Sequence, residues 1–255
     1  MEQTKRRTAF VTGGSRGIGR GIVRMLAEDG YDVAFTYYSE EGHARSLKEE
    51  LDNAGVRGFY YQASLEKPGI AERVTEKAIQ DLGGIDLLIC NAGVTIHNDT
   101  LNLDPEDMDY LYNLNYRSYM MSAKIAANDM VKRGVKGNII FIASTRGFRA
   151  YPDDSLYGGF KAALIRSIES MALDLAEHGI RVNGVAPGAT AVRGNYTPEE
   201  LREEEWTRRI PLGRKGSPDE VGRLVRFIAS DAMAYMTGNT IKLDGGLILP
   251  GMPEE

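Results

Sequence analysis

Cysteine and tryptophan are almost absent from this chain of 255 residues, which has one of each, and histidine is scarce with three. The lone cysteine, Cys90, excludes an internal disulfide framework and favours a reducing compartment. The apolar run after the opening MEQTKRR is too short for a signal peptide, and no stretch approaches the roughly 20 apolar residues of a membrane span. We therefore expect a cytoplasmic protein that does not enter a membrane.

Neither sign of charge dominates the sequence. Lys and Arg number 31 against 36 Asp and Glu, which gives a formal net charge of −5 and a pI near 5.4. This mild acidity argues against broad binding to nucleic acid or to a membrane surface. Glycine, in contrast, is abundant at 29 residues, which indicates many tight turns or close backbone approaches.

Short apolar runs alternate with longer helical patterns along the chain. Strands are expected at 8–12, 32–37, 58–62, 85–90, 138–144, 180–186 and 239–243, and helices at about 18–29, 40–54, 69–82, 106–133, 155–177 and 218–229. Strands that recur after each helix and are apolar almost throughout predict a parallel sheet buried on both faces. We expect an α/β fold in which 1–255 form a single-domain, Rossmann-like doubly wound parallel sheet with helices on both faces. The charged segment 189–215 interrupts the alternation and is expected to be a substrate lid.

A glycine-rich turn follows the first expected strand. The stretch TGGSRGIG leads directly into a helical pattern, and a strand, a glycine turn and a helix together point backbone N–H groups and the helix dipole at a phosphate. Gly13, Gly17 and Gly19 can supply the turn, the close approach to a pyrophosphate and a tight contact between helix and sheet. An ordinary glycine-rich turn would give a similar pattern, but its place at the start of an alternating chain favours a dinucleotide site.

The end of the second expected strand bears on which dinucleotide binds. An acidic residue there would bind the adenosine ribose and repel a 2′-phosphate, whereas this chain reads FTYYSEEG, with Tyr38 and Ser39 near that place. Arg16, inside the glycine turn, could pair with a 2′-phosphate or could be a solvated surface charge. Glu40 and Glu41 follow closely and weaken the argument. We expect NADP, with NAD as the alternative.

Two asparagines lie near the same expected edge of the sheet. The NAG stretch follows the fourth strand, so Asn91, Ala92 and Gly93 would flank a cofactor bound beyond the carboxyl ends of the strands; a plain strand-ending turn is the alternative. Asn115 lies within the expected helix at 106–133, where asparagine is a poor helix former. It indicates a helix kink or a buried hydrogen bond, unless it faces solvent.

A tyrosine and a lysine lie one helical turn apart in SLYGGFKAAL. Side chains at i and i+4 share a helix face, so Lys161 can hold its ammonium near the Tyr157 phenol. One positive charge about 4 Å away at an effective dielectric of about 20 is worth roughly 4 kcal/mol. This corresponds to about three pKa units and is an upper figure, because desolvation of the phenolate opposes the shift.

Tyr157 could then exchange a proton with a substrate oxygen that Ser144, at the end of the fifth expected strand, also binds. The adjacent Gly158 and Gly159 would let a cofactor or backbone approach the helix. A tyrosine and a lysine at this spacing are common on amphipathic helices, so the combination with Ser144 carries the argument.

In their order and spacing, these motifs resemble the short-chain dehydrogenase/reductase family over nearly the whole chain. The matching stretches are TGGSRGIG (12–19), NAG (91–93), Asn115, Ser144, YGGFK (157–161), APG (186–188), PLGRKGSPDEVG (211–222) and YMTGNTIKLDGG (235–246). The resemblance implies that Tyr157 is the acid/base, that Ser144 positions the substrate oxygen, and that Asn115 helps to hold a water in a proton relay. It also implies that Lys161 lowers the pKa of the tyrosine and binds the nicotinamide ribose.

The resemblance further implies where the cofactor lies and what the protein does. The implied contacts are Gly13, Ser15, Arg16, Gly17, Ile18, Gly19, Tyr38, Ser39, Ser64, Leu65, Asn91, Ala92, Gly93, Tyr157, Lys161, Pro187, Gly188 and Thr190. The function would be an NADP(H)-dependent carbonyl reductase or alcohol dehydrogenase in a homotetramer. Glucose 1-dehydrogenases and 3-oxoacyl carrier-protein reductases are both similar to this chain, so a sugar or a 3-oxoacyl thioester is the expected substrate. A sterol or polyol, or a dinucleotide sensor without catalysis, is the alternative.

Three departures from the family pattern stand out. Ser64-Leu65 replace an Asp-Val pair that contacts adenine in many relatives. Val192 stands where relatives often have a hydroxyl that contacts the carboxamide, and Thr190 is the nearest substitute. Arg146 and Arg149 follow Ser144 where small or apolar residues are more usual; they would attract an acidic substrate or form a solvated rim.

Overall fold

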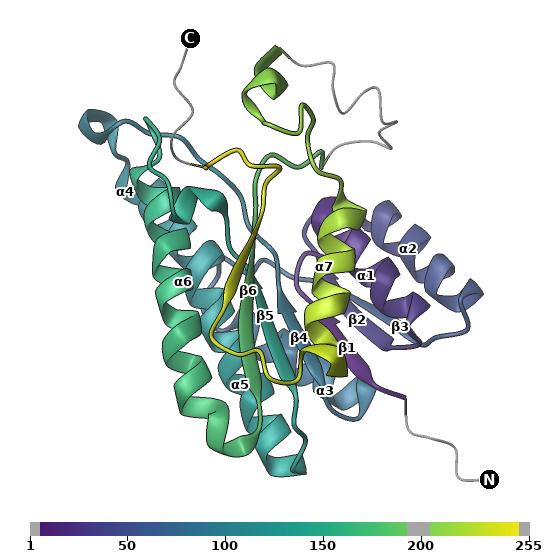
Figure 1. The fold of residues 1–255 in the computed structure, drawn as a ribbon. Helices are drawn as coiled ribbons and strands as arrows, with labels where there is room; N and C mark the ends of the chain where they lie inside the picture. Colours follow the sequence, from purple (N-terminus) through teal and green to yellow (C-terminus); the bar gives the residue numbers. More distant parts are fainter. Residues whose placement is uncertain (1–5, 193–204, 250–255) are drawn as a thin grey trace, which may run out of the picture.

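Seven parallel strands form the centre of the protein in a computed structural model that describes residues 6–192 and 205–249 (Figure 1). Their order is β3-β2-β1-β4-β5-β6-β7, so successive strands run outward from β1 in one direction and from β4 in the other. This reversal creates the crevice beyond the carboxyl ends of β1 and β4 where doubly wound sheets bind ligands. The expected Rossmann-like fold is confirmed.

The expected strands and helices are found with ends shifted by a few residues. The strands are β1 (Thr8–Val11), β2 (Asp32–Tyr37), β3 (Gly58–Gln62), β4 (Leu87–Cys90), β5 (Asn138–Ile142), β6 (Arg181–Pro187) and β7 (Thr240–Leu243). The helices are α1 (Gly17–Glu28), α2 (Glu41–Asn53), α3 (Ile70–Leu82), α4 (Pro105–Tyr112), α5 (Ser118–Arg133), α6 (Ser155–Leu175) and α7 (Pro218–Ala229). Of these, no described helix is both long and apolar enough to cross a bilayer.

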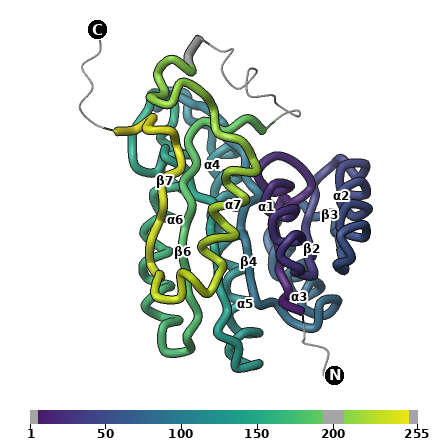
Figure 2. The backbone as a smooth tube through the Cα atoms, turned by 45° about the vertical axis from the view of Figure 1, so that its right-hand side comes forward, coloured from purple at the N-terminus to yellow at the C-terminus, as the bar shows by residue number. Residues whose placement is uncertain are grey.

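Helices cover both faces of the sheet because successive strand residues point to opposite sides. In β1, Ala9 and Val11 pack into one apolar cluster with α1, α2 and α7, whereas Phe10 packs into the other with α3, α5 and α6. The two layers lie on either side of the sheet in Figures 1 and 2. Burial on both faces explains why the strands are apolar almost throughout.

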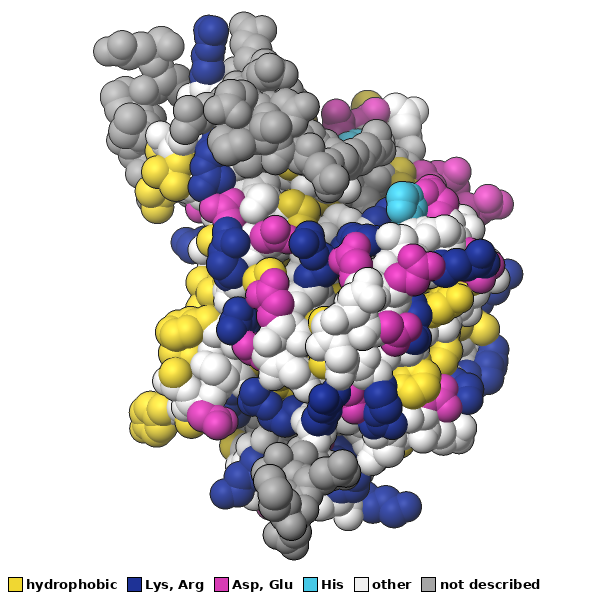
Figure 3. All heavy atoms as spheres, turned by 90° about the vertical axis from the view of Figure 1, so that its right-hand side faces the viewer, with side chains coloured by type: hydrophobic (Ala, Val, Ile, Leu, Met, Phe, Trp, Pro, Cys, Tyr) yellow, Lys and Arg dark blue, Asp and Glu magenta, His cyan; other side chains and the backbone are white. Residues whose placement is uncertain are grey.

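The outer surface of the layer formed by α1, α2 and α7 carries charges of both signs. Figure 3 shows Lys and Arg side chains interspersed with Asp and Glu on this side of the molecule. Ion pairs join some of them, including Arg20 with Glu50 at 2.5 Å and Arg226 with Asp29 at 2.5 Å.

The single helix expected at 106–133 is divided in two. A π-helical turn, Asn113–Arg117, separates α4 from α5, and Asn115 lies within it with its side chain fully buried. In a π turn the backbone hydrogen bonds join residues five apart in place of four, and such turns often occur at functional sites. The kink that asparagine indicated is therefore present, and the expectation of one continuous helix was wrong.

The expected lid at 189–215 lies partly outside the described residues, because the description of the chain stops at 192 and resumes at 205. The flanks are anchored to each other by a β-bridge between Thr190 and Gly216. A short 3-10 helix, Glu205–Arg209, leads back toward α7, where Ser217 and Glu220 form a capping box. These contacts fix the ends of the segment beside the carboxyl edge of the sheet.

Candidate active site

A cavity of about 730 Å³ lies at the carboxyl edge of the sheet and gathers most of the residues expected to bind the cofactor or substrate. Two expected residues, Ser39 and Ser64, are not among the lining residues, and their contacts with a cofactor stay predictions. The expected residues that line it are Gly13, Ser15, Arg16, Gly17, Ile18, Gly19, Tyr38, Leu65, Asn91, Ala92, Gly93, Asn115, Ser144, Tyr157, Lys161, Pro187, Gly188 and Thr190.

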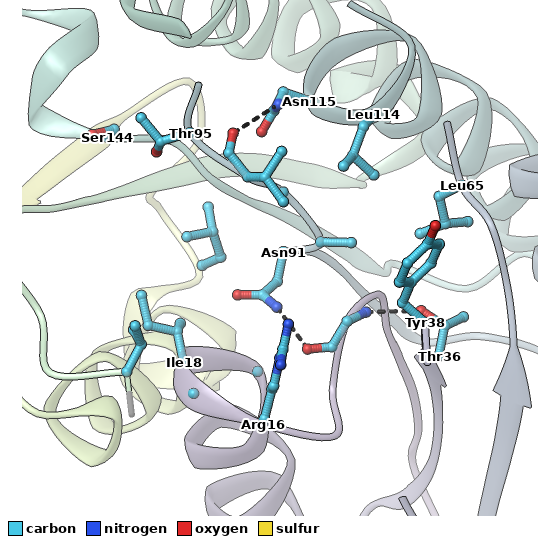
Figure 4. A pocket seen from close by; sticks show the side chains of 18 of the residues that line it. Arg16, Ile18, Thr36, Tyr38, Leu65, Asn91, Thr95, Leu114, Asn115 and Ser144 are labelled. Carbon is cyan, nitrogen blue, oxygen red and sulfur yellow. Dashed lines mark hydrogen bonds between the residues drawn. The ribbon is translucent and has the colours of Figure 1, made fainter. Parts of the chain in front are cut away.

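The glycine turn forms one wall of the cavity and is held by hydrogen bonds from its neighbours. Gly13 has a φ of 66°, which favours glycine, and its N–H donates to Thr36 Oγ1 at 2.8 Å (Figure 4). A Cβ on Gly13 would lie 2.9 Å from Ala92 Cα, and a Cβ on Gly19 would collide with the Gly13 carbonyl oxygen. Only glycines at these positions allow the glycine turn, the first turn of α1 and the turn after β4 to lie this close together.

The first turn of α1 faces this wall with its backbone N–H groups free of side-chain caps. Arg16 occupies the N-cap position without a capping hydrogen bond, and the first turn contains no acidic residue. An uncapped helix N-terminus next to a glycine turn is a site for a phosphate anion. The residues here therefore fit the pyrophosphate of a dinucleotide.

Arg16 lies at the mouth of the cavity with its guanidinium largely exposed. Its Nη1 is 3.3 Å from Glu40 Oε1, and the other oxygen of that carboxylate is 2.8 Å from His43 Nε2. Tyr38 also lines the mouth, with 56% of its surface exposed, but Glu40 is not part of the lining. Arg16 is thus neither an isolated solvated charge nor committed to a buried partner.

Asn91 fastens the turn after β4 to the glycine turn. Its side-chain amide donates to the carbonyls of Thr12 and Gly13, both at 3.0 Å, and Figure 4 shows the bond to Gly13. In return, Thr12 Oγ1 accepts from the backbone N–H groups of Asn91 at 2.9 Å and Ala92 at 3.1 Å. The amide therefore has a fixed structural task beside the cavity, which a plain strand-ending turn would not require.

Asn115 projects from the π turn toward the same edge from the opposite layer. Its Nδ2 donates to the Val94 carbonyl at 3.1 Å (Figure 4). Its Oδ1 is buried without a hydrogen-bond partner among the described residues, and a Cβ on Gly93 would collide with this oxygen. A buried acceptor in a cavity wall invites a water or a ligand donor, so the solvent-facing alternative for Asn115 is wrong.

Ser144, Tyr157 and Lys161 meet at the far end of the cavity from the glycine turn. The hydroxyls of Ser144 and Thr95 hydrogen-bond to the Tyr157 phenol, and both bonds lower its pKa. Lys161 is fully buried; its Nζ lies 5.7 Å from the Tyr157 ring centroid and donates to the Ile142 carbonyl at 2.9 Å. The i, i+4 spacing on α6 thus brings the two side chains together as expected.

The electrostatics of this cluster differ from the expectation. Burial is the largest influence on Tyr157 and raises the pKa of the phenol above its ordinary value. Burial also lowers the pKa of Lys161 to about 7, because the ammonium loses its hydration. In the protein by itself, the expectation of a lowered tyrosine pKa is therefore wrong: burial raises it, and the Lys161 ammonium is directed at a backbone carbonyl.

The two glycines after Tyr157 have different surroundings. A Cβ on Gly158 would lie 2.9 Å from Asp154 Oδ2 and 3.0 Å from the Arg146 carbonyl oxygen. A Cβ on Gly159 would meet no described atom within 4 Å. The expected close approach is found at Gly158, and it is to the protein's own chain; no backbone approaches Gly159, where an approach by a cofactor stays a prediction.

The two arginines after Ser144 are engaged within the protein. Arg146 Nη1 is 3.0 Å from Asp154 Oδ2, and its guanidinium lies 4.7 Å from the Tyr151 ring centroid. Arg149 also lies over Tyr151, at 5.8 Å, and bonds to the Leu247 carbonyl at 3.4 Å. The ion pair compensates the charge of Arg146, which weakens the idea that it attracts an acidic substrate.

Two of the family departures have a place in the cavity. Leu65 lines the wall near Tyr38 (Figure 4), so an apolar surface stands where relatives contact adenine. Thr190 and Val192 both line the cavity, and Thr190 Oγ1 donates to the Gly188 carbonyl at 3.3 Å. Thr190 therefore lies in the cavity, and its role as the substitute hydroxyl stays a prediction.

Several lining residues escaped the sequence analysis. Thr95 is the most consequential, because its hydroxyl reaches the Tyr157 phenol; it follows the NAG stretch by two positions, and this proximity was the available signal. Thr36 is the last residue but one of β2, and its hydroxyl holds the glycine turn. Others, including Glu66, Tyr110 and Leu114, come from loops or helices and carry no motif.

A glycine-walled cavity at the switch point of a doubly wound sheet, with a Ser–Tyr–Lys cluster opposite, defines a nicotinamide-dependent oxidoreductase. Comparison with known families agrees, because a model described as enoyl-(acyl carrier protein) reductase matches residues 13–248. The chain belongs to the short-chain dehydrogenase/reductase family, whose members are NAD(P)-dependent enzymes acting on alcohol and ketone groups.

Relatives with different named substrates are similar to nearly the whole chain. The 3-oxoacyl-[acyl-carrier-protein] reductase FabG of Staphylococcus aureus is 34% identical, over 98% of this chain and 100% of that protein. The L-rhamnose 1-dehydrogenase (NAD(P)(+)) of a Sphingomonas species is 30% identical, over 97% and 98%. The crystal structure of an acetoin dehydrogenase from Salmonella typhimurium superposes with a TM-score of 0.92 at 32% identity, over 97% of this chain and 99% of that one.

Proposed function

We propose that this protein is an NADP(H)-dependent oxidoreductase that interconverts a carbonyl and a secondary alcohol, with Tyr157 as the acid/base. The observation that carries the proposal is the convergence of the Ser144 and Thr95 hydroxyls on the Tyr157 phenol, beside buried Lys161 and within the glycine-walled cavity. A phenol held by two hydroxyls can pass its proton to an oxygen placed between them.

Each residue has a distinct task in this proposal. The bound cofactor supplies or accepts the hydride at its nicotinamide. Ser144 holds the substrate oxygen, and Tyr157 gives that oxygen a proton during reduction and removes it during oxidation. Lys161 binds the nicotinamide ribose. The unpartnered Oδ1 of Asn115 holds a water that connects the cavity to solvent.

The direct test is Tyr157→Phe, which keeps the ring and removes the proton. We expect turnover to fall about 10²–10⁴-fold while NADPH binding, measured by fluorescence titration, changes little. The matched control is Tyr116→Phe, which removes a hydroxyl bonded to Ser167 on the helices rather than in the cavity. Full activity in the Tyr157 variant would contradict the proposed acid/base. Cofactor binding with no turnover of any carbonyl by the wild type would favour the sensor instead.

We propose that the cofactor is NADP rather than NAD. The cavity wall at the end of β2 consists of Thr36, Tyr37 and Tyr38, none of which would repel a 2′-phosphate, and Arg16 stands beside them. The exposed pair with Glu40 is worth little in water and can open when a phosphate arrives. Arg16→Ala should therefore weaken NADPH more than NADH, whereas Glu40→Gln should strengthen NADPH. Equal effects of Arg16→Ala on both cofactors would remove the argument.

The proposed substrate is a sugar or a 3-oxoacyl thioester, the classes named for two of the relatives. Acetoin joins the panel because of the structural neighbour, and a sterol and a polyol serve as alternatives. Specificity constants with each cofactor should differ by orders of magnitude between classes, since a pocket built for one substrate leaves polar groups unpaired with another.

We further propose that the whole chain is one domain and that it acts in the cytoplasm as a homotetramer through α4, α5, α6 and the C-terminal segment. Support for the assembly comes from exposed apolar side chains such as Leu173 on α6, 79% exposed, and Tyr112 on α4, 41% exposed. Light scattering coupled to size-exclusion chromatography measures the assembly directly. A monomer at micromolar concentration would contradict it.

A further inference from the structure

An ion pair between buried Asp154 and partly exposed Arg146 lies near Tyr157, outside the lining of the cavity. Arg146 lies two residues after Ser144, in the short 3-10 helix Thr145–Gly147. Asp154 is the N-cap residue of α6 and lies three residues before Tyr157. Their Nη1 and Oδ2 atoms are 3.0 Å apart, and the side chain of Asp154 is only 2% exposed. The pair thus joins the segment that carries Ser144 to the helix that carries Tyr157.

This pair lacks the hydrogen bonds that normally accompany buried charges. Apart from this 3.0 Å contact with each other, neither the carboxylate oxygens of Asp154 nor Nη1 of Arg146 has a hydrogen-bond partner among the described residues. Buried pairs without such support often contribute little or nothing to stability compared with apolar side chains of similar size. Stability alone is therefore a poor reason for the presence of these two residues.

Asp154 also lies where a third segment of the site is attached. Asn98 forms a β-bridge with Asp154, and its N–H donates to the Asp153 carbonyl at 3.1 Å. Asn98 is three residues after Thr95, whose hydroxyl reaches the Tyr157 phenol. The segments that supply both hydroxyls to the phenol therefore converge on the Arg146–Asp154 pair.

We propose that Arg146 and Asp154 are positioning residues that set the pH at which the Tyr157 phenol exchanges its proton, an inference that rests on the proposed function. The pair does so in two ways. It holds the Ser144 and Thr95 segments against α6, and the two opposite charges balance each other at the phenol. Loss of either partner would leave the other charge uncompensated in a region shielded from water.

The other groups around the phenol do not offer the same control. The two hydroxyls are neutral, and the ammonium of Lys161, on α6, donates to the Ile142 carbonyl. Tyr119, on α5, lies beneath with its ring 5.0 Å from Lys161 Nζ, and Cys90, on β4, is buried beside them. Among the charged neighbours, Asp154 raises the pKa of Tyr157 and Arg146 lowers it.

The test is a set of substitutions with effects of opposite sign. Asp154→Asn leaves Arg146 alone, so the midpoint for Tyr157 ionisation should fall by about half a pH unit to one unit; Arg146→Gln should raise it by a similar amount. The double variant should return near the wild-type midpoint. Arg146→Lys, which keeps the charge, should also stay near the wild-type value.

Two readouts separate this inference from the proposed function. The first is the pH dependence of kcat for alcohol oxidation. The second is the ultraviolet absorbance of tyrosinate in the free protein, taken as the difference between each variant and the same variant with Tyr157→Phe. Absence of turnover in the wild type would end the proposed function, while the tyrosinate titration would still test the ion pair.

The matched control is Arg149→Gln, which removes the same charge from the same loop. Arg149 shares the Tyr151 ring with Arg146 but bonds to the Leu247 carbonyl instead of Asp154, so its loss should leave the midpoint unchanged. Opposite shifts in the two single variants, with recovery in the double variant, support the inference. Shifts of the same sign, or loss of thermal stability with no shift, would overturn it and leave a purely structural pair.

Discussion

The two ends of the cavity are built in opposite ways. At the cofactor end, Thr36 and Asn91 hydrogen-bond the glycine turn, the Thr12 hydroxyl accepts from the turn after β4, and close contacts lock the backbone. At the substrate end, the helices and loops contain an unpartnered acceptor on Asn115, a sparsely supported ion pair and a buried ammonium on Lys161. Within the described residues, no buried unpartnered side-chain atom belongs to β1, α1 or β2.

This difference shows what each end has to do. The glycine turn and the N-terminus of α1, here called the cradle, bind a phosphate through their backbone shape. The side chains that hold the cradle can therefore be fully hydrogen-bonded before the ligand binds. Proton transfer requires groups whose charge can change, and such groups must keep free capacity for a substrate, a ribose or a water. Buried groups of this kind reduce the stability of the free protein and gain partners when ligands bind.

The substitution with the largest expected effect on the cofactor end is Gly19→Ala. The added methyl would collide with the Gly13 carbonyl oxygen and lie 2.7 Å from Asn91 Nδ2. We expect NADPH binding to be lost and the free energy of unfolding to fall by about 3 kcal/mol, measured by fluorescence titration and urea unfolding. Gly42→Ala is the control, because a Cβ there meets no described atom within 4 Å. Normal binding by the Gly19 variant would show that the cradle is less rigid than its contacts indicate.

Lys161→Met should have the opposite effect on stability at the substrate end. It removes a buried ammonium, so turnover should be lost while the free protein gains about 1–2 kcal/mol. Because the folded pKa, about 7, is below the ordinary value of 10.5, the charge penalty is full below pH 7 and is relieved as the pH rises toward 10.5. The stability gap between variant and wild type should therefore narrow over that range in thermal unfolding. A constant gap would mean that the ammonium is not the cause.

Features of the molecule with a local cause were predictable from the sequence. Buried strands such as β1 and β5 are short apolar runs, and the glycine turn carries its own signature, so both were predicted within a few residues. Pro187 and Gly188, which the family resemblance placed at the cofactor, both line the cavity. Each of these features follows from residues that are neighbours in the chain.

The features that the sequence did not predict arise from contacts between distant segments. At the π turn, Asn115 donates a hydrogen bond to the Val94 carbonyl, 21 residues away. A helical pattern in the sequence does not predict such a turn. The pKa of Tyr157 was predicted to fall, yet burial, which depends on the whole fold, raises it. The pairing of Arg146 with Asp154 links two loop residues without any regular spacing. Sequence patterns therefore describe the cradle better than the proton-transfer end.

The smallest expected effect comes from the adjacent glycines of α6, which sharpen the comparison within the substrate end itself. Gly158→Ala would press a methyl against Asp154 Oδ2 and the Arg146 carbonyl, and should cost about 1 kcal/mol by urea unfolding, with a shifted pH profile. Gly159→Ala adds the same methyl to an exposed, open position of the same helix and should stabilise by roughly 0.5–1 kcal/mol through helix propensity. Only Gly158 touches the ion pair. Equal responses at both positions would show that the packing around the pair is loose enough to absorb a methyl group, which would count against its role in positioning Tyr157.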